Sequence, residues 1–360
     1  MKPLQLLHIV RRYGPVGGME RYVWELTREL AAMGHDVRIL CTRRESETPA
    51  GVEVVTLGEV AEKPRWLAHM RFSHRVSEWV RRHPAPERII HSHERTGVHH
   101  VTTFHGPPFV HVLEKAWWQR ISLRVRANLW LEKREVCGPQ VRAVIPNSAV
   151  IATSLKHFYP CIGPRLQKPI SPGVSEGPVR PDRMVLGNGG VIGFIGKEWR
   201  RKGLDIAVRI VRELRRQRPA LKFLVAGADP AEISPLFTDG ENGYQLLGEI
   251  DTTAFYPQLD LLLHPARHEP YGMVIAEAMA ARVPVLMSDR CGAAADAPAY
   301  MALPLDADIR LWAERCHELI GAHPASFRRS WKDVARKQVQ CYKAIHAGAD
   351  HPASNRRKTS

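Results

Sequence analysis

Two carboxylates and a glycine turn stand out in the stretch from His264 to Pro284 of this 360-residue chain. Glu269 precedes Gly272, and Glu277 follows it inside a segment whose apolar residues recur at helical spacing. The free N–H groups of Gly272 and Met273 at the start of such a helix would face an anion. Carboxylates on either side accept hydrogen bonds from hydroxyl groups. The spacing therefore predicts a phosphate held between two polyol groups, as in a nucleotide sugar.

A second candidate is the cationic loop that follows the apolar run from Val191 to Gly196. Lys197 and Lys202 bracket two arginines there, and cations at the carboxyl end of a strand neutralise a diphosphate. A glycine pair, Gly17 and Gly18, stands before a predicted helix, where the backbone approaches a phosphate closely. The alternative for the first loop is a basic turn that is merely exposed to solvent. The alternative for the glycine pair is a tight turn at the start of a helix.

Two further groups of residues raise the question of a metal ion. Five histidines lie between His91 and His105, but neither an HExxH motif nor a carboxylate partner accompanies them. Asp306 and Asp308 stand at the start of a predicted helix, where acidic residues are favoured electrostatically. We therefore predict no metal site and interpret the aspartates as capping residues.

The elements that position these residues alternate between strands and helices on both sides of a proline-rich segment. Strands are expected at 4–10, 36–42, 52–57, 89–93, 101–106, 143–148, 191–196, 221–227, 244–248, 261–263 and 283–286. Helices are expected at 19–33, 66–82, 109–136, 149–158, 204–216, 273–279, 306–320 and 327–346. This alternation predicts an α/β fold of two Rossmann-like, doubly wound domains facing a cleft.

The composition limits the classes of protein. Most of the net charge of +15 falls in residues 1–165, which indicates an anionic partner such as a membrane surface, a phosphorylated glycan or a nucleic acid. The six cysteines form no CxxC pair, so we expect neither a zinc ribbon nor a disulfide framework, and a reducing cytoplasm fits. No apolar run reaches 18 residues and no signal peptide is recognisable, so no membrane span is expected.

One predicted helix, from Phe109 to Val136, mixes aromatic with basic residues. They include Trp117, Trp118, Trp130, Arg120, Arg124, Arg126, Lys133 and Arg134. Such a helix either covers a core or lies at a membrane interface, and both interpretations stay open at this point.

The sequence EPYGMVIAEAMA from Glu269 resembles the paired-glutamate signature of retaining glycosyltransferases of the GT-B type, in family 4 (glycosyl transferases group 1). The loop at Gly17 and Gly18, the sequence TFHG around His105, and the basic loop are similar to further motifs of that family. The resemblance covers nearly the whole chain. It implies an acceptor-binding Rossmann-like domain over 1–173, a linker over 174–190 and a nucleotide-sugar-binding Rossmann-like domain over 191–322. A helix over 323–347 then crosses back to the first domain, and a basic tail over 348–360 is expected to be disordered.

The resemblance also implies a role for each matching residue. Glu269 would contact the hydroxyls of the donor sugar, Glu277 would contact the ribose, and His105 would lie near the reacting sugar. The predicted catalytic residues are His105, Glu269 and Lys202. The predicted donor-binding residues are Gly17, Gly18, Lys197, Lys202, Glu269, Tyr271, Gly272, Met273 and Glu277.

Two positions depart from the family pattern. Lys197 replaces an arginine, which keeps the charge but loses the bidentate guanidinium. The segment from Glu94 to His100 is too short for a helical crossover between parallel strands. Either the helix is deleted or these strands are joined differently.

The resemblance implies a retaining, metal-independent hexosyltransferase that needs no cofactor and uses a nucleoside-diphosphate sugar, expected to be a UDP-sugar. From the charge and the Trp-containing segment we expect a cell-envelope glycan or glycolipid acceptor, foremost lipopolysaccharide core. The protein is then expected in the cytoplasm, on the anionic inner face of the membrane, without nucleic acid. A GT-B epimerase or phosphorylase is the alternative within the fold. A basic nucleic-acid- or membrane-binding protein is the alternative outside it.

Overall fold

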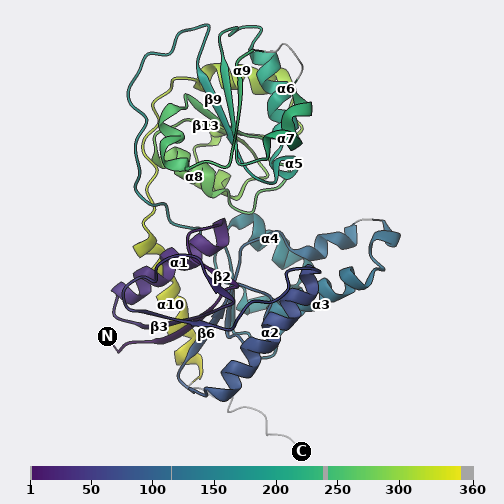
Figure 1. The fold of residues 1–360 in the computed structure, drawn as a ribbon, viewed down its shortest axis with the longest axis vertical. Coiled ribbons are helices and arrows are strands. Elements are labelled where there is room, and N and C mark those ends of the chain that lie inside the picture. Colours follow the sequence, from purple (N-terminus) through teal and green to yellow (C-terminus); the bar gives the residue numbers. More distant parts are fainter. Residues whose placement is uncertain (1, 115, 238–241, 350–360) are drawn as a thin grey trace, which may run out of the picture. The chain divides into compact units, whose positions relative to one another are not determined.

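The computed structural model describes residues 2–114, 116–237 and 242–349, and the chain divides into two compact units (Figure 1). Unit 1 contains residues 1–173 and 330–360, and unit 2 contains residues 174–329. The segment 174–190, expected as a linker, is therefore part of unit 2, and the last helix is part of unit 1. The predicted tail over 348–360 lies, from residue 350 onward, outside the described residues.

Unit 1 is built on a six-stranded parallel sheet in the order β5-β3-β1-β6-β7-β8. Its strands are β1 (Gln5–Ile9), β3 (Asp36–Cys41), β5 (Val52–Thr56), β6 (Ile89–Ser92), β7 (Val101–Phe104) and β8 (Ala143–Pro146). Two short strands, β2 (Arg12–Tyr13) and β4 (Arg43–Arg44), pair separately. Because the strand order reverses direction at β1, the switch point of the sheet lies between β1 and β6.

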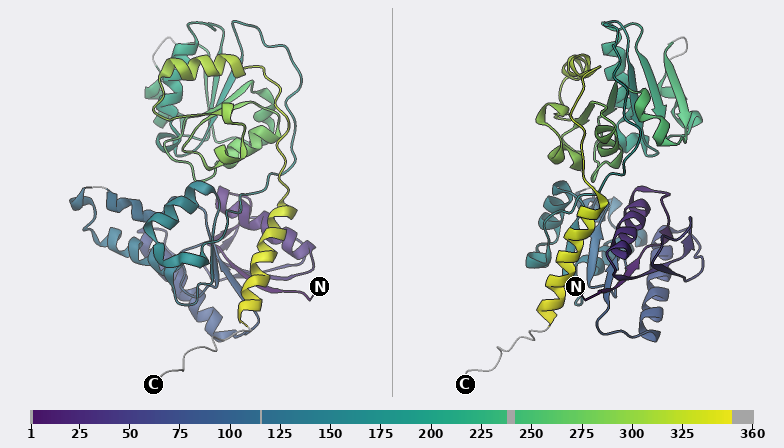
Figure 2. Two further views of the ribbon diagram at one scale, coloured as in Figure 1. Left: turned by 180° about the vertical axis from the view of Figure 1, so that it is seen from behind. Right: turned by 90° about the vertical axis from the view of Figure 1, so that its left-hand side faces the viewer.

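The helices of unit 1 are α1 (Gly18–Ala32), α2 (Arg65–Arg82), α3 (Leu123–Cys137), α4 (Ala149–Phe158) and α10 (Trp331–Ala349), with 3-10 turns η1 (Phe109–Glu114), η2 (Trp117–Gln119) and η3 (Pro160–Arg165). The last helix, α10, packs beside α1 (Figure 2). Gln338 of α10 donates a hydrogen bond to the hydroxyl of Tyr22 on α1 at 3.0 Å. Helix α10 is thereby tied to α1 within one unit.

Unit 2 repeats the same topology, with a parallel sheet in the order β11-β10-β9-β12-β13-β14. Its strands are β9 (Val191–Ile195), β10 (Lys222–Ala226), β11 (Tyr244–Gly248), β12 (Leu261–His264), β13 (Val285–Ser288) and β14 (Ala302–Leu303). Its helices are α5 (Trp199–Lys202), α6 (Leu204–Leu214), α7 (Pro230–Ile233), α8 (Met273–Ala280) and α9 (Ile309–Leu319). Short 3-10 turns are η4 (Ser234–Leu236), η5 (Thr252–Ala254), η6 (Tyr256–Gln258), η7 (Gly292–Asp296) and η8 (Ala299–Met301). The predicted pair of doubly wound α/β sheets is confirmed.

Apolar runs in the strands of unit 2 are explained by burial on both faces of the sheet. Leu261 and Leu263 belong to one hydrophobic core, and Leu262 between them belongs to another. The neighbouring strand β10 divides in the same way, with Phe223 in the first core and Leu224 in the second. A strand covered on both faces reads as continuous apolar sequence instead of alternating.

The prediction of one long helix over 109–136 is wrong. Within the described residues, η1 and η2 come first, and the regular helix α3 begins only at Leu123. Ser122 sets this start, because its side chain accepts a hydrogen bond from the N–H of Val125. The Trp and Arg residues therefore lie partly on 3-10 turns and partly on α3.

The short connection after β6 joins two adjacent parallel strands directly. β6 pairs with β7 in parallel register, with His91 opposite Val101. The segment 93–100 between them contains no helix. Side chains hold this loop instead: Thr96 contacts both Ser92 and His99, and His99 contacts the carbonyl of Glu135. The crossover helix is thus absent, and a loop held by these hydrogen bonds replaces it.

Cysteine pairing corrects one expectation. Cys137, at the end of α3, and Cys161, in η3, form a disulfide, with Cα atoms 6.7 Å apart. Cys41, Cys291, Cys316 and Cys341 are free. The sequence separation of 24 residues does not reveal this pair, because only the packing of η3 against α3 brings the two residues together.

No helix in the described part of the chain combines the length and the apolar character that a membrane crossing requires.

Candidate active site

Glu269 lies in the loop after β12, at the carboxyl edge of the sheet in unit 2. β12 is the neighbour of β9, so this loop stands at the point where the strand order reverses. An isolated bridge to Cys291 and a hydrogen bond from the N–H of Gly292 to the carbonyl of Glu269 fix its backbone. Open α/β sheets bind their ligands at this position.

Three basic side chains surround the buried carboxylate of Glu269. Lys202 Nζ lies 3.3 Å from its Oε2, Arg201 lies 3.5 Å away, and Nε2 of the buried His264 lies 3.3 Å away. Burial by itself raises the pKa of Glu269, but the hydrogen bond from His264 and the charges of Lys202 and Arg201 hold that pKa well below its usual range. Burial also lowers the pKa of His264. A neutral imidazole therefore donates to an ionised carboxylate.

Two glycines explain how Lys202 reaches Glu269. The lysine side chain passes over Gly196, where an added Cβ would lie 2.1 Å from its Cδ. Gly203 follows Lys202 in the left-handed conformation, with φ +79°, and an added Cβ there would meet the carbonyl oxygen of Pro265 at 2.0 Å. This tight turn between α5 and α6 places the lysine at the carboxyl edge of β9.

Helix α8 begins beside Glu269. Its N-cap, Gly272, has φ +95° and provides no side-chain cap, so the first N–H groups, beginning with Met273, remain available to an anion. Glu277 lies one turn further along α8 and accepts a hydrogen bond from the hydroxyl of Tyr256 at 2.7 Å. The structure thus brings Lys202, Glu269, Gly272 and Met273 to one edge of unit 2.

Two other predicted residues of unit 2 are engaged elsewhere. The Tyr271 side chain is buried, and its hydroxyl accepts a hydrogen bond from Arg329, which also pairs with Asp296. Lys197 is exposed and forms an ion pair with Glu249 at 2.6 Å. Tyr271 therefore anchors the loop from within, while Lys197 stands outside the cluster around Glu269.

The predicted glycines of unit 1 stand at the start of α1. Gly17 is its N-cap in an extended conformation, and an added Cβ would lie 2.4 Å from a carboxylate oxygen of Glu20. Gly18 faces open space, with no described atom within 4 Å of an added Cβ. The backbone at Gly18 is therefore accessible to a ligand.

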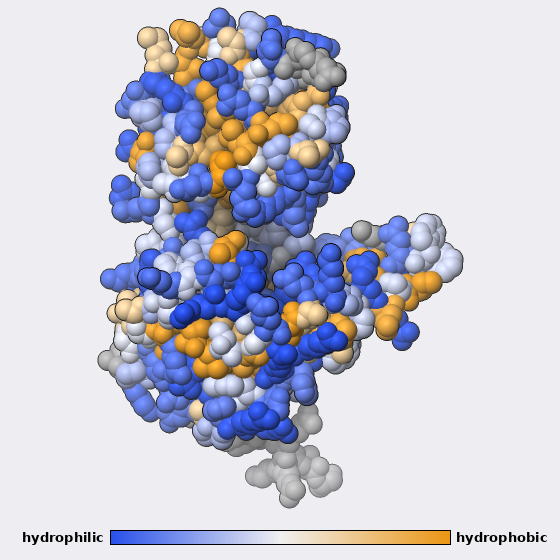
Figure 3. All heavy atoms as spheres, in the orientation of Figure 1, coloured by the Kyte–Doolittle hydropathy of each residue, from blue (hydrophilic) through white to orange (hydrophobic). Residues whose placement is uncertain are grey.

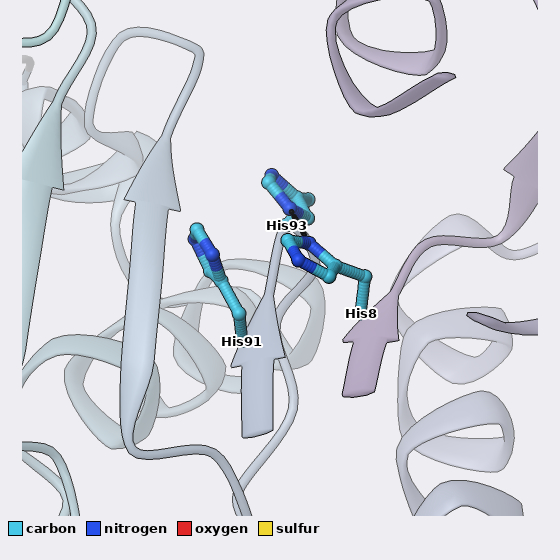
Figure 4. A group of neighbouring side chains, drawn as sticks. All are labelled: His8, His91 and His93. Carbon is cyan, nitrogen blue, oxygen red and sulfur yellow. Dashed lines mark hydrogen bonds between the residues drawn. The ribbon is translucent and has the colours of Figure 1, made fainter. Parts of the chain in front are cut away.

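His105 follows β7 and is partly exposed, in contact with a cluster of buried histidines. Its Nε2 lies 2.9 Å from Nδ1 of His93, and the Nε2 of His93 lies 3.1 Å from Nδ1 of His8 (Figure 4). Asn147 donates a hydrogen bond to the backbone carbonyl of His105 at 3.0 Å. The adjacent strands β1, β6 and β7 bring these side chains together.

Ring nitrogens of His8, His91 and His93 lie within 4.8 Å of one another, close enough to be tested as a metal site (Figure 4). A ligating histidine must place the metal in the plane of its ring. The rings of His91 and His93 are stacked, with centroids 4.3 Å apart and an interplanar angle of 28°, so their planes do not meet at a common point nearby. Both nitrogens of His91 already contact hydroxyl groups, those of Tyr342 and Thr103. The geometry favours hydrogen bonding within the cluster.

The aspartate pair behaves in part as predicted. Asp308 is the N-cap of α9, and its side chain accepts a hydrogen bond from the N–H of Arg310 at 2.7 Å. Capping is thereby confirmed for Asp308.

Sequence reasoning missed three residues of this site. Arg201 belongs to the basic loop, but its sequence position does not show that it points toward Glu269. His264 directly ends a buried strand, and a polar residue at that position is the signal by which it could be found. Tyr256 lies in η6, outside any motif, and only the packing of that turn brings it to Glu277.

Two family models match the chain. The model described as Glycosyltransferase Family 4 matches residues 16–176, and the model described as Glycosyl transferases group 1 matches residues 189–321. Together they cover most of both units.

Curated relatives and solved structures agree with these matches. The chain is 23% identical to the lipopolysaccharide glucosyltransferase WaaG of Escherichia coli over 311 residues, which are 78% of this chain and 79% of the relative. It is 26% identical to a D-inositol 3-phosphate glycosyltransferase of Jonesia denitrificans, with 94% and 90% covered. The crystal structure of WaaG superimposes with a TM-score of 0.73 at 19% identity, covering 96% of this chain and 98% of that one. Sucrose-phosphate synthase from Thermosynechococcus elongatus gives 0.70 at 17%, covering 96% and 100%. The fold is that of the GT-B glycosyltransferases.

Proposed function

Because the chain belongs to the glycosyltransferases, with a family 4 domain followed by a group 1 domain, we propose that it moves a sugar from a nucleoside-diphosphate donor to a cell-envelope glycan. The transfer is metal-independent and retains the configuration of the sugar. A UDP-sugar is the expected donor, and lipopolysaccharide core is the expected acceptor.

The contact between Lys202 and Glu269 carries the donor part of this proposal. A nucleoside-diphosphate sugar has two parts that need opposite partners: hydroxyl groups, which bond to a carboxylate, and a diphosphate, which bonds to cations. Glu269 is held ionised at the edge of the sheet, and Lys202 and the start of α8 provide positive charge beside it. In this arrangement a sugar bonds to Glu269 while its diphosphate lies at Lys202 and the N–H groups of α8.

A mechanism without a metal or a covalent intermediate fits these residues. Lys202, together with Arg201, supplies the charge that stabilises the departing diphosphate. Glu269 is engaged by His264, Lys202 and Arg201, which suits an acceptor of hydrogen bonds better than a free nucleophile. The leaving phosphate then takes the proton of the acceptor hydroxyl on the face where the new bond forms, so that configuration is retained.

We propose that Glu277 contacts the ribose of the donor. This carboxylate lies one helical turn beyond the N-terminus of α8 and shares a hydrogen bond with Tyr256. Tyr256 orients the carboxylate, and a nucleotide hydroxyl bonds to it in the loaded enzyme. The aromatic ring and the carboxylate together suit the nucleoside half of the donor.

The acceptor part of the proposal is supported by a relative and by one surface. WaaG, which is similar over most of this chain, is a lipopolysaccharide glucosyltransferase. In unit 1, η2 and the start of α3 form a projecting segment whose surface carries both hydrophobic and hydrophilic side chains (Figure 3). We call residues 116–134 the aromatic-basic segment. Its exposed residues include Trp117 at 67%, Trp118 at 61%, Ile121 at 64%, Leu123 at 69% and Trp130 at 51%.

Exposed tryptophans beside arginines suit an anionic membrane surface, because the rings enter the interface and the cations meet lipid phosphates. Arg124 and Arg126 are exposed on the same segment. A transferase attached there meets an acceptor that is assembled on the cytoplasmic leaflet. We therefore place the protein in the cytoplasm, peripherally bound to the inner face of the membrane, with no nucleic acid as partner.

A donor screen tests the function directly. Purified protein is incubated with UDP-, GDP- and ADP-sugars, with and without a lipopolysaccharide core extract, and nucleotide release is measured. Acceptor-dependent release from one donor is expected, and Lys202→Ala should abolish most of it. If the acceptor extract stimulates nucleotide release from none of the donors, the proposal is contradicted. Repeating the assay with excess chelator should leave the rate nearly unchanged, whereas a loss that magnesium or manganese restores contradicts metal independence.

A further inference from the structure

Three imidazoles form an unbranched hydrogen-bonded chain that ends at the predicted catalytic residue His105. His8 Nδ1 contacts His93 Nε2 at 3.1 Å, and His93 Nδ1 contacts His105 Nε2 at 2.9 Å. Figure 4 shows the inner pair, with His8 from β1 and His93 just after β6. Each hydrogen bond joins one Nδ1 to one Nε2, so the nitrogen that carries the proton in one ring determines the nitrogen that carries it in the next.

All three rings are neutral at physiological pH. Burial lowers the pKa of His8 to about 3 and that of His105 to about 3, and it lowers the pKa of His93 well below its usual value. A neutral imidazole carries one proton, on either Nδ1 or Nε2. The chain therefore has only two consistent arrangements, one with every proton on Nδ1 and one with every proton on Nε2.

The inner end of the chain decides between them. Nε2 of His8 is buried and has no hydrogen-bond partner among the described residues. With every proton on Nε2, His8 would bury an N–H group without an acceptor. With every proton on Nδ1, only a lone pair is left unpaired there. Orphaned buried N–H groups are rarer in proteins than under-satisfied acceptors.

We propose that His8 and His93 are positioning residues that hold His105 in the tautomer with its proton on Nδ1, so that His105 meets its ligand as a hydrogen-bond donor. This assignment rests on the proposed function, because His105 is a catalytic residue that the resemblance to family 4 implies for a glycosyltransferase. Nδ1 of His105 has no partner among the described side chains, and the residue is partly exposed. Its ligand is therefore an oxygen acceptor, such as a sugar hydroxyl or a phosphate oxygen, and His105 does not act as a base through Nδ1.

His91 lies in the same cluster but outside the chain. Its Nδ1 contacts the hydroxyl of Tyr342 on α10 at 2.6 Å, and its Nε2 contacts Thr103 at 2.9 Å. It is as buried as His8 and stacks on His93. A substitution at His91 consequently disturbs the packing of the cluster without breaking the hydrogen bonds between His8, His93 and His105, which makes it a matched control.

Nitrogen NMR of the intact protein labelled with ¹⁵N-histidine measures the tautomer directly. His105 is identified by the signals that disappear in His105→Gln. In the wild-type protein we expect protonated Nδ1 and bare Nε2 at His105. In His93→Leu the proton is expected to move to Nε2, the position that a histidine side chain favours in water. His91→Asn should leave the His105 signals as in the wild type.

A wild-type His105 that carries its proton on Nε2 overturns the proposal, even if His93→Leu does not fold. An unchanged His105 tautomer in folded His93→Leu overturns the role of His93. Activity provides a second measurement: His105→Asn places an amide donor near the position of Nδ1, and His105→Gln places it near Nε2. The Asn variant is expected to retain on the order of tenfold more kcat/KM. Equal losses contradict the donor role, whereas failure of the donor screen contradicts the proposed function and leaves the NMR result unaffected.

Discussion

Lys202 lies across Gly196, so closely that a Cβ on this glycine would come within 2.1 Å of the lysine Cδ. The glycine directly after β9 is thus required for the lysine to reach Glu269, whose Oε2 lies 3.3 Å from the lysine Nζ. Lys202 is recognisable in the sequence by its spacing of five residues from Lys197. The position of its side chain, however, depends on a third residue, Gly196, which carries no functional group.

Gly196→Ala should reproduce the loss caused by Lys202→Ala without unfolding the protein. The methyl group meets a flexible side chain, so the lysine moves away and the backbone stays in place. Loss of one charge-assisted contact to the leaving diphosphate costs on the order of 2–3 kcal/mol, or roughly thirtyfold to a hundredfold in kcat/KM. Steady-state rates and thermal melting of both variants provide the measurement.

Gly189→Ala is the control for this substitution. Gly189 lies in the same unit, and the nearest neighbouring atom, the carbonyl oxygen of Ala220, would stand 3.8 Å from the new Cβ, at ordinary contact distance. Its kcat/KM should remain close to that of the wild type. A Gly196→Ala enzyme that is as active as the wild type would show that Lys202 does not need this path.

His264 is expected to act on catalysis through Glu269. In His264→Leu the carboxylate loses a donor at 3.3 Å, so its pKa rises toward the usual range. The acid limb of the kcat/KM profile, which reports protonation of Glu269, then moves to higher pH, and kcat/KM at neutral pH falls roughly fivefold to tenfold. His264→Gln retains an N–H near the position of Nε2 and should restore most of the activity. An acid limb that is identical in the wild type and in His264→Leu contradicts this role.

The sequence predicts the donor side of the site better than the contacts that support it. Glu269 and Lys202 belong to motifs of fixed spacing, and each motif follows a predicted strand. The order of the strands then places the two residues close together. His264 escapes this reasoning because a strand residue does not reveal which neighbour its ring meets. The contact of His91 with Tyr342 spans 251 residues, and that of Tyr22 with Gln338 spans 316. No local pattern connects such pairs.

The aromatic-basic segment shows a different limit. An uninterrupted mixture of Trp, Arg and Leu satisfies the period of a helix, so the expectation of one helix over 109–136 followed from periodicity alone. The helix begins at Leu123, and its N-cap is Ser122. Serine is a residue type that favours this position, so it is the local signal for the start of the helix. Periodicity identifies the helix, and the capping residue determines where it begins.

Glu135 makes the stability of the protein depend on pH. Its carboxyl group is buried, and this burial raises its pKa from 4.5 to about 7, despite the hydrogen bond from Thr102 and the charge of Arg95. Between these two values the folded protein binds the proton and the unfolded chain releases it, so the free energy of unfolding falls as pH rises. Glu135→Gln cannot ionise and should therefore be more stable at pH 8 by on the order of 2–3 kcal/mol.

Denaturant unfolding at pH 5 and at pH 8 measures this difference. The advantage of Glu135→Gln should be small at pH 5 and should grow toward pH 8, since Gln keeps an oxygen that accepts from Thr102. The exposed residue Glu62 provides the control, and Glu62→Gln should show no such growth. A stability difference between Glu135→Gln and the wild type that stays constant across this range argues against a raised pKa.

The aromatic-basic segment is expected to bind anionic membranes through two separable contributions. Arg124→Ala with Arg126→Ala removes two exposed cations, each contributing about 1 kcal/mol near an anionic surface, so vesicle affinity should fall roughly thirtyfold. Trp117→Ala with Trp118→Ala removes the apolar contribution and should weaken binding with less dependence on salt. Co-sedimentation with phosphatidylglycerol-containing vesicles and with neutral vesicles, at low and high salt, distinguishes the two.

The control for lost charge is a pair of exposed arginines in unit 2, Arg209 and Arg310. Arg209→Ala with Arg310→Ala lowers the net charge by the same amount and should leave vesicle binding nearly unchanged. Equal losses in the two double variants would mean that net charge, and not this segment, attracts the protein. If the wild-type protein does not bind anionic vesicles at low salt, the membrane assignment fails, while the transferase assignment is unaffected because it rests on Glu269 and Lys202.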